Sequence, residues 1–338
     1  MRKQYKKPLF TTVIVLAALV GFLVYQTRGN TDITDEGKKS IIIAYQTGVD
    51  PSKVAQAEGL YEKNSNQPIE WKKFDTGPDV VNALASGDVS IGNIGSSPFA
   101  AATSRGVPIE AFLITAKLGS SEALVVNQKS GIKQPNDLIG KTIAVPFVST
   151  THYSLLSALK HWNIPENKVK IINLRPPEIV AAWNRGDIDA AYVWEPALSK
   201  VKATGNVLID SHQVGEWGAP TYDLWVVRKD FAEKNPEFLK SFVSTALTQL
   251  EKYNQNPEVF SHDEKNVNEI STLTGSSPAD IALLLSGNTY LSRKQQIETL
   301  SNEFSKNILD TAQFLKGQGK VDQVKVDYHD NVSTAFLQ

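Results

Sequence analysis

One phrase of this sequence occurs twice, 99 residues apart. Residues 79–91 read DVVNALASGDVSI, and residues 178–190 read EIVAAWNRGDIDA. In each copy, apolar residues at helical spacing run into a Gly-Asp pair and a short apolar segment, which is typical of a helix ending at a glycine before a strand. A helix followed by Gly-Asp and a strand is also a common local arrangement, so the repeat alone proves no duplication. We take it to predict two similar α/β lobes.

Short β-branched runs alternate with helical stretches around both copies of the phrase. This alternation is typical of strand-helix-strand units, and it predicts parallel sheets with helices on both faces. The expected strands are 41–45, 69–74, 89–94, 142–145, 169–173 and 190–194, and the expected helices are 52–60, 79–85, 153–162 and 178–184.

The chain of 338 residues has the length of about two ordinary domains. Apolar runs near 117–126 and 223–227 are expected to join the lobes, so the chain crosses between them twice. From Phe231 onward the pattern is mostly helical, and this part is expected to return and cover the first lobe. The predicted organisation is a signal peptide or membrane anchor at 1–30, a linker at 31–40, a first lobe at 41–122 plus 223–338, and a second lobe at 123–222.

The charges are unevenly distributed along the chain. Residues 1–30 carry five Lys or Arg and no acid, which leaves 30 basic and 36 acidic residues in the remainder, a net charge of −6. A body this acidic lacks the basic surface that neutralises nucleic-acid phosphates. We therefore expect no nucleic-acid partner.

The N-terminal segment has the pattern of an export signal. Four basic residues precede an uncharged, mostly apolar stretch from Pro8 to Gln26, which is long for a cleaved signal peptide and barely long enough to span a bilayer. No small-x-small cleavage site follows it, so cleavage and retention as an anchor both remain open. Because positive residues stay on the cytoplasmic side, we expect the acidic body to lie in the periplasm, outside the cytoplasm.

The chain contains no cysteine. This excludes disulfides, thiolate metal sites, a cysteine nucleophile and a lipid-modified N-terminal cysteine. The sequence also contains no nucleophile elbow, phosphate-binding loop or dinucleotide fingerprint. We expect a binding protein without catalytic activity, cofactor or metal.

Two predicted strand ends are followed by hydroxyl-rich helix starts. Gly95-Ser96-Ser97-Pro98 places Ser97 as the expected N-cap, and Ser149-Thr150-Thr151-His152-Tyr153 opens the corresponding helix of the second lobe. Unpaired N–H groups at a helix N-terminus favour anions, and serine and threonine hydroxyls donate to the same anion. Simple helix capping explains each segment equally well. One segment from each lobe would hold a small anion in the cleft.

Other candidate residues lie at strand ends and crossings. Gln46 follows the first strand and can donate and accept, although a turn hydrogen bond would also explain it. Asp223 lies where the chain re-enters the first lobe, and Glu122 lies in the other crossing. A carboxylate beside aromatic faces such as Trp194 is suited to a small ammonium group, whereas a solvated strand-end acid is the alternative. The residues alone therefore point to an exported, two-lobed protein that binds a small anion or zwitterion.

Several stretches resemble the taurine branch of the sulfonate, nitrate and taurine solute-binding family of bacterial ABC importers. The likeness extends from about Ile41 to the C-terminus. The Gly-Asp and Gly-Ser-Ser phrases recur across sulfonate and nitrate binders, whereas the phrases STTHY and EWGAPT are particular to the taurine branch. The stretches are 44–47, 83–88, 91–98, 144–153 and 214–221.

The resemblance implies an α/β, type II periplasmic binding protein fold with a double-crossover hinge and a ligand cleft between two lobes. It also implies delivery of taurine to a membrane permease and its ATPase for sulfur acquisition, by a protein expected to be monomeric. Asp223 would pair with the taurine ammonium, Trp194 or Tyr153 would pack on the two-carbon linker, and Glu122 is our addition. The residues expected at the sulfonate are Gln46, Ser96, Ser97, Thr150 and Thr151.

Three other functions are alternatives to taurine binding. A binder of general aliphatic sulfonates differs only in the ligand. A thiamine-pyrimidine synthase of the same superfamily would carry a cysteine-rich iron motif, which a chain without cysteine lacks. The effector-sensing half of a transcription regulator would begin with a helix-turn-helix, where this chain has its export segment.

Overall fold

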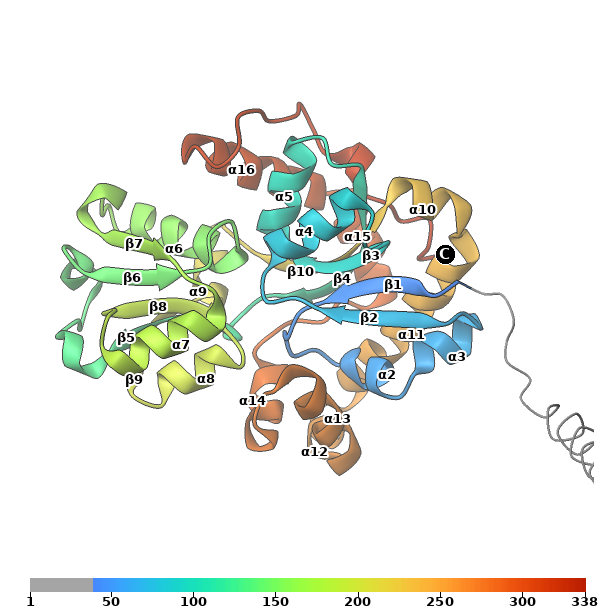
Figure 1. Ribbon diagram of the computed structural model, residues 1–338, viewed down its shortest axis with the longest axis horizontal. Coiled ribbons are helices and arrows are strands. Elements are labelled where there is room, and N and C mark those ends of the chain that lie inside the picture. The colour runs from blue at the N-terminus through green and yellow to red at the C-terminus, as the bar shows by residue number, and fades with distance from the viewer. Residues whose placement is uncertain (1–38) are drawn as a thin grey trace, which may run out of the picture. The chain divides into compact units, whose positions relative to one another are not determined.

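The computed structural model describes residues 39–338 (Figure 1). The predicted signal peptide or anchor at 1–30 lies outside the described residues. Within residues 39–338, every helix is too short or too polar to cross a bilayer. Residues from Ser40 to Gln338 form one compact unit.

The first sheet has the strand order β2-β1-β3-β10-β4. Its first three strands run parallel, and β10 pairs antiparallel with both β3 and β4. Buried aliphatic residues such as Ile43 and Ile91 face each other in the register of β1 and β3. The strands are β1 (Ile41–Tyr45), β2 (Ile69–Lys73), β3 (Ile91–Gly95), β4 (Ile109–Lys117) and β10 (Tyr222–Arg228).

The second sheet repeats this arrangement in the order β7-β6-β8-β5-β9. Three strands are again parallel, and β5 pairs antiparallel with β8 and β9. We call the elements around the first sheet the first lobe, and those around the second sheet the second lobe. Figure 1 draws the strands of the second lobe at the left and those of the first lobe from the centre to the right. The strands are β5 (Glu122–Asn127), β6 (Thr142–Val145), β7 (Lys170–Asn173), β8 (Ala190–Trp194) and β9 (Gly205–Asp210).

Both sheets are mixed, which differs from the purely parallel sheets that the sequence predicts. The reason is the double crossing. The strand β5 enters the second sheet directly after β4 has left the first, and β10 returns to the first sheet after the second lobe is complete. Each crossing strand inserts antiparallel beside strands formed by the local strand-helix-strand units. The predicted pair of similar α/β lobes is confirmed.

The repeated phrase forms equivalent helices in the two lobes, α4 (Gly77–Ser86) and α7 (Pro176–Arg185). Both end at a glycine in the left-handed region, Gly87 with φ 86° and Gly186 with φ 78°. Glycine adopts this conformation without the steric strain that a Cβ would introduce. The expected Gly-Asp helix ends are therefore confirmed in both copies.

The expected helix at 52–60 is instead two helices, α2 (Lys53–Ala57) and α3 (Leu60–Ser65). Gly59 separates them with φ 64°, a conformation that a continuous right-handed helix excludes. The turn lets Tyr61 pack into the first-lobe core, where its ring stacks on Phe242 with centroids 4.4 Å apart. The other helices preceding β10 are α5 (Ser96–Ser104), α6 (Thr150–His161), α8 (Ala197–Lys202) and α9 (Ser211–Glu216).

The C-terminal part is helical, and its buried side chains join the core of the first lobe, as expected. One helix, α16, also reaches the second lobe, where Phe314 lies edge-on to Tyr153 with ring centroids 5.0 Å apart. The C-terminal helices are α10 (Lys229–Lys234), α11 (Pro236–Gln255), α12 (Pro257–His262), α13 (Glu264–Thr274), α14 (Ile281–Ser286), α15 (Arg293–Ser301) and α16 (Phe304–Gly317).

Candidate ligand-binding site

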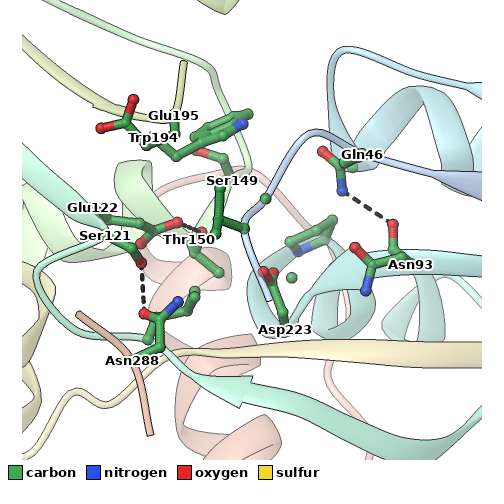
Figure 2. Close-up of a pocket in the computed structure, with 16 residues that line it drawn as sticks. Gln46, Asn93, Ser121, Glu122, Ser149, Thr150, Trp194, Glu195, Asp223 and Asn288 are labelled. Atoms are coloured by element: carbon green, nitrogen blue, oxygen red, sulfur yellow. Dashed lines mark hydrogen bonds between the residues drawn. The ribbon is translucent and has the colours of Figure 1, made fainter. Parts of the chain in front are cut away.

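A cavity lies between the two lobes, at the carboxyl ends of β1, β3, β6 and β8 (Figure 2). The space open to the centre of a water molecule is about 40 Å³. One water molecule needs about 10–15 Å³ by this measure, so the cavity suits a ligand of a few heavy atoms. Its lining residues are Gln46, Gly48, Val49, Gly77, Asn93, Gly95, Pro98, Leu118, Ser121, Glu122, Ser149, Thr150, Trp194, Glu195, Asp223 and Asn288.

Three helix N-termini meet at the cavity wall. Gly77 begins α4, Gly95 is the N-cap of α5, and Ser149 is the N-cap of α6. A Cβ on Gly95 would lie 2.5 Å from Cγ2 of Thr150, and one on Gly77 would lie 2.7 Å from Cγ of Pro98. Glycine is therefore what allows these helix ends to approach so closely. Their free N–H groups and positive dipole ends favour an anion here.

Gln46 is held in place beside these helix ends. Its Nε2 donates to the backbone oxygen of Asn93 at 3.0 Å, as drawn in Figure 2. The Asn93 side chain is in turn bonded to the carbonyl of Leu224 at 3.2 Å and to Thr115 at 3.3 Å. One amide proton and the oxygen of Gln46 remain for a ligand.

Asp223 brings a carboxylate to the cavity from the first lobe. It lies opposite Gly95 in the register of β10 and β3, close to the N-terminus of α5. Burial, reinforced by the charge of Asp50 and opposed by that of Lys53, raises the pKa of Asp223 to about 7. Among residues 39–338, the Asp223 carboxylate has no hydrogen-bond partner.

Glu122 brings a second carboxylate from the second lobe. Thr150 Oγ1 donates to its Oε1 at 2.5 Å, and Ser211 Oγ donates to its Oε2 at 3.0 Å. Burial raises the pKa of Glu122 to about 8; the two hydroxyl bonds oppose this rise, and the charge of Asp223 adds to it. The Thr150 hydroxyl is therefore directed at Glu122 as well as placed at the helix N-terminus.

Trp194 and Glu195 form the wall at the end of β8. Trp194 lies opposite Glu122 in the register of β8 and β5, and it is half-buried. The Glu195 carboxylate accepts from the backbone N–H and the hydroxyl of Ser199, at 3.2 and 2.9 Å. Trp194 thus supplies an apolar surface, whereas Glu195 caps the start of α8.

The structure brings five of the nine predicted site residues to the cavity: Gln46, Glu122, Thr150, Trp194 and Asp223. The other four, Ser96, Ser97, Thr151 and Tyr153, do not line it.

These four residues have other surroundings. Ser96 Oγ accepts from the N–H of Tyr222 at 3.2 Å, and Thr151 Oγ1 lies 2.7 Å from the Ser149 hydroxyl. Ser97 is fully buried, and its hydroxyl is unpartnered among the described residues. The ring of Tyr153 instead contacts Phe314 of α16.

The expectation that Ser97 is an N-cap is wrong. The strand β3 ends at Gly95 and α5 begins at Ser96, so Gly95 takes the cap position. No connecting residue is left between strand and helix for Ser97 to occupy. By contrast, Ser149 caps α6 by accepting from the N–H of His152 at 3.1 Å. The helix therefore begins at Thr150, within the segment expected to open it and three residues before the expected bound at Tyr153.

Sequence reasoning did not select Ser121 and Asn288. Asn288 Oδ1 accepts from Ser121 Oγ at 2.5 Å and from the N–H of Gly119 at 3.0 Å. Asn288 follows α14, far along the chain from the strand ends, and only the return of the C-terminal helices places it at the crossing. No local motif marks such a residue.

Comparison with known proteins agrees with this architecture. Residues 39–269 match the family described as the substrate binding domain of the ABC-type glycine betaine transport system. The sequence is 52% identical to the taurine-binding periplasmic protein of Escherichia coli (strain K12), over 96% of this chain and 98% of that protein.

Solved structures show the same fold. The periplasmic aliphatic sulphonate binding protein SsuA from Escherichia coli superposes with a TM-score of 0.72 at 22% identity, covering 88% of this chain and 92% of that one. The alkanesulfonate-binding protein SsuA from Xanthomonas axonopodis pv. citri, bound to MOPS, gives a TM-score of 0.70 at 20% identity, covering 84% and 95%. The fold is that of the periplasmic binding proteins, and the chain belongs to the family of substrate-binding domains of ABC-type transport systems, which are binding proteins and not enzymes.

Proposed function

We propose that this protein binds taurine between its lobes, outside the cytoplasm, and delivers it to an ABC permease driven by its ATPase. The observation that carries the proposal is the cavity itself, in which three helix N-termini face the carboxylates of Asp223 and Glu122. Taurine has one group of each required kind, a sulfonate and an ammonium. The 52% identity to a taurine-binding protein supports the same ligand.

The sulfonate would lie at the helix N-termini. A sulfonate stays ionised at any biological pH, so neutral N–H and O–H donors hold it without proton exchange. The backbone N–H groups beside Gly77 and Gly95 and the amide of Gln46 would supply these donors. This arrangement needs no lysine or arginine at the ligand.

The ammonium would pair with Asp223, which has no hydrogen bond of its own among the described residues. A buried carboxylate facing an ammonium forms a charge-assisted bond, stronger than one between neutral groups. Glu122 lies on the opposite wall, and the two-carbon linker would pack against Trp194. A plain alkanesulfonate has no cation for these acids, so the cavity favours taurine over the general aliphatic sulfonates.

We further propose that the lobes, with boundaries at 41–122 plus 223–338 and at 123–222, close on the ligand. Bonds already connect the two lobes. Thr47 Oγ1 donates to the backbone oxygen of Glu195 at 3.0 Å, and an Arg175 guanidinium nitrogen lies 3.1 Å from Oδ1 of Asp79. The Arg175–Asp79 ion pair is exposed, and exposed ion pairs contribute little to stability. These contacts would therefore still let the lobes open and release the ligand.

Calorimetric titration of the purified protein with taurine and ethanesulfonate tests the ligand. We expect tight binding of taurine and binding of ethanesulfonate at least about tenfold weaker, the equivalent of one charge-assisted bond. Equal affinities would favour a protein that binds aliphatic sulfonates in general. The absence of heat with taurine would overturn the proposal. Mass spectrometry of the mature N-terminus distinguishes cleavage of residues 1–30 from their retention as an anchor.

A further inference from the structure

Ser121 lines the cavity on the segment where the chain first crosses from one lobe to the other. It lies between the end of β4 and the start of β5, directly before Glu122, and it is buried. Figure 2 draws Ser121 with Glu122 on the side of the cavity away from Gln46. Ser121 is therefore expected at the ammonium end of the ligand, because Gln46 belongs to the donors at the sulfonate end.

The Asn288 side chain fixes the direction of the Ser121 hydroxyl. One atom of this amide receives both the N–H of Gly119, at 3.0 Å, and the hydroxyl of Ser121, at 2.5 Å. A backbone N–H only donates, so the atom that receives it is the amide oxygen, which only accepts. The Ser121 hydroxyl must therefore give its single proton to Asn288. Its oxygen lone pairs remain, so Ser121 can act toward the cavity only as an acceptor.

The backbone on both sides of this bond is fixed as well. Lys117 and Thr289 exchange both of their backbone hydrogen bonds, at 2.9 and 3.0 Å. A Cβ on Gly119 would collide with the backbone oxygen of Gly287, so the two segments approach more closely than any other residue would allow. Asn288 lies between Gly287 and Thr289, and its amide is thereby held against the crossing segment.

The ammonium of the ligand needs more acceptors than one carboxylate offers. A primary ammonium has three N–H groups, and each needs a partner when it is buried. The Asp223 carboxylate, without a hydrogen bond among the described residues, can receive one or two of them. The two oxygens of Glu122 each already accept a hydroxyl, from Thr150 and from Ser211. Ser121 offers a further acceptor whose own proton is already committed.

We propose that Ser121 accepts a hydrogen bond from the ligand ammonium, that Asn288 is the positioning residue that orients it, and that the cavity thereby selects a primary ammonium over an N-methylated one. The inference rests on the proposed function and names its substrate class more closely. The direction of the hydrogen bonds carries it, since Gly119 and Ser121 both donate to one amide oxygen. Each N-methyl group removes one N–H from the ligand and leaves a buried acceptor unpaired.

The aromatic content of the cavity wall supports the same selection. Among residues 39–338, Trp194 is the one aromatic residue that lines the cavity. Quaternary ammonium ligands are typically held in cages of several aromatic rings. Ser121 and Asp223 offer oxygen acceptors instead, and a fully methylated ammonium cannot use these because it has no N–H.

The test measures by calorimetry the affinities of the full chain for taurine, N-methyltaurine and ethanesulfonate. Ser121→Ala removes the acceptor, and Ser120→Ala removes the exposed hydroxyl of the preceding residue as a matched control. Asn288→Ala releases the Ser121 proton, so that the hydroxyl can turn toward the cavity. Asn288→Asp is the conservative rescue, because a carboxylate still accepts from both the Gly119 N–H and the Ser121 hydroxyl.

We expect the parental protein to bind N-methyltaurine at least about tenfold more weakly than taurine, the equivalent of one hydrogen bond to a charged group. Ser121→Ala should lower the affinity for taurine about tenfold and that for N-methyltaurine less than about threefold, because the ligand methyl group can face the new alanine. The affinity for ethanesulfonate should stay unchanged. Asn288→Ala should give the same pattern, whereas Asn288→Asp and Ser120→Ala should keep the parental preference for taurine over N-methyltaurine.

A purely structural role for Ser121 predicts an equal loss for all three ligands and an unchanged preference for taurine over N-methyltaurine. That result would overturn the inference, as would equal affinities of the parental protein for these two ligands. If Ser121→Ala fails to fold, as circular dichroism would show, Asn288→Ala decides in its place, and an unchanged preference in that variant overturns the inference. A parental protein that binds no taurine overturns the proposed function and this inference together, whereas normal taurine binding without the selective loss overturns only the inference.

Discussion

The two carboxylates of the cavity reach it from equivalent strands but have different surroundings. Asp223 stands on β10, and its carboxylate has no hydrogen bond among the described residues. Glu122 stands on β5, and two hydroxyls donate to its carboxylate. This difference in hydrogen bonding indicates that the two acids have different roles. Asp223 is available to a ligand cation, whereas Glu122 with a pKa of about 8 is mostly neutral at pH 7 and ties α6 to β5.

The sharpest test of this comparison is Asp223→Asn. We expect this substitution to lower the affinity for taurine about 100-fold, because it leaves a buried ammonium without its charged partner. Ethanesulfonate, which has no ammonium and is repelled by the ionised carboxylate, should bind as tightly as before or more tightly. Calorimetry with both ligands measures the two effects, and equal losses would mean that Asp223 does not receive the ammonium.

The pH dependence of affinity tests the same carboxylate without a mutation. The pKa of Asp223 is about 7 in the free protein, and an ammonium favours its ionised form. Taurine affinity should therefore fall about tenfold from pH 8 to pH 6, in proportion to the ionised fraction. Ethanesulfonate affinity should rise over the same interval, because protonation removes a repelling charge. A flat profile for taurine would contradict the assignment.

Glu122→Gln examines the other half of the comparison. Glutamine resembles the protonated glutamate in shape and charge, so taurine affinity at pH 7 should fall only about threefold, the value of one altered hydrogen bond. Isothermal titration beside Asp223→Asn gives the ratio of the two losses. A loss as large as that of Asp223→Asn would show that Glu122 carries the charge that binds the ammonium.

The smallest effect is expected at an exposed contact between the lobes. Arg175→Ala removes the exposed ion pair with Asp79 across the lobes, and such pairs contribute about 0.2–1 kcal/mol. The affinities for both ligands should fall about twofold, because the contact joins the lobes and touches neither ligand. A loss confined to taurine would place Arg175 in ligand selection instead of closure.

The sequence predicts the fold well because its evidence is local. The repeated helix with its Gly-Asp end is visible in thirteen residues of each copy, and it marks equivalent elements in the two lobes. The mixed character of the sheets is not visible in this way. It depends on which strands pair with β5 and β10. These pairings include segments that are far apart in the sequence, so no local pattern reveals them.

The candidate site is predicted in part for the same reason. Gln46, Thr150 and Trp194 follow strand ends, where the carboxyl edge of a sheet must bring them together. Ser97 was misplaced because one residue of helix register decides which side chain faces the cavity. Asn288 belongs to no motif, and only packing in three dimensions reveals its place at the cavity.

The register of β4 and β10 has a consequence for how such a protein is assembled and redesigned. The chain leaves the first sheet at Lys117 and re-enters it at Tyr222, and these two residues face each other across the antiparallel ladder. In topological terms the whole second lobe is the loop of a β-hairpin. A module inserted at a hairpin tip can be exchanged as one continuous piece while the host sheet keeps all its strands. The second lobe, which supplies about half of the cavity wall, can thus be replaced as one segment. Glu122 and Thr150 belong to that segment.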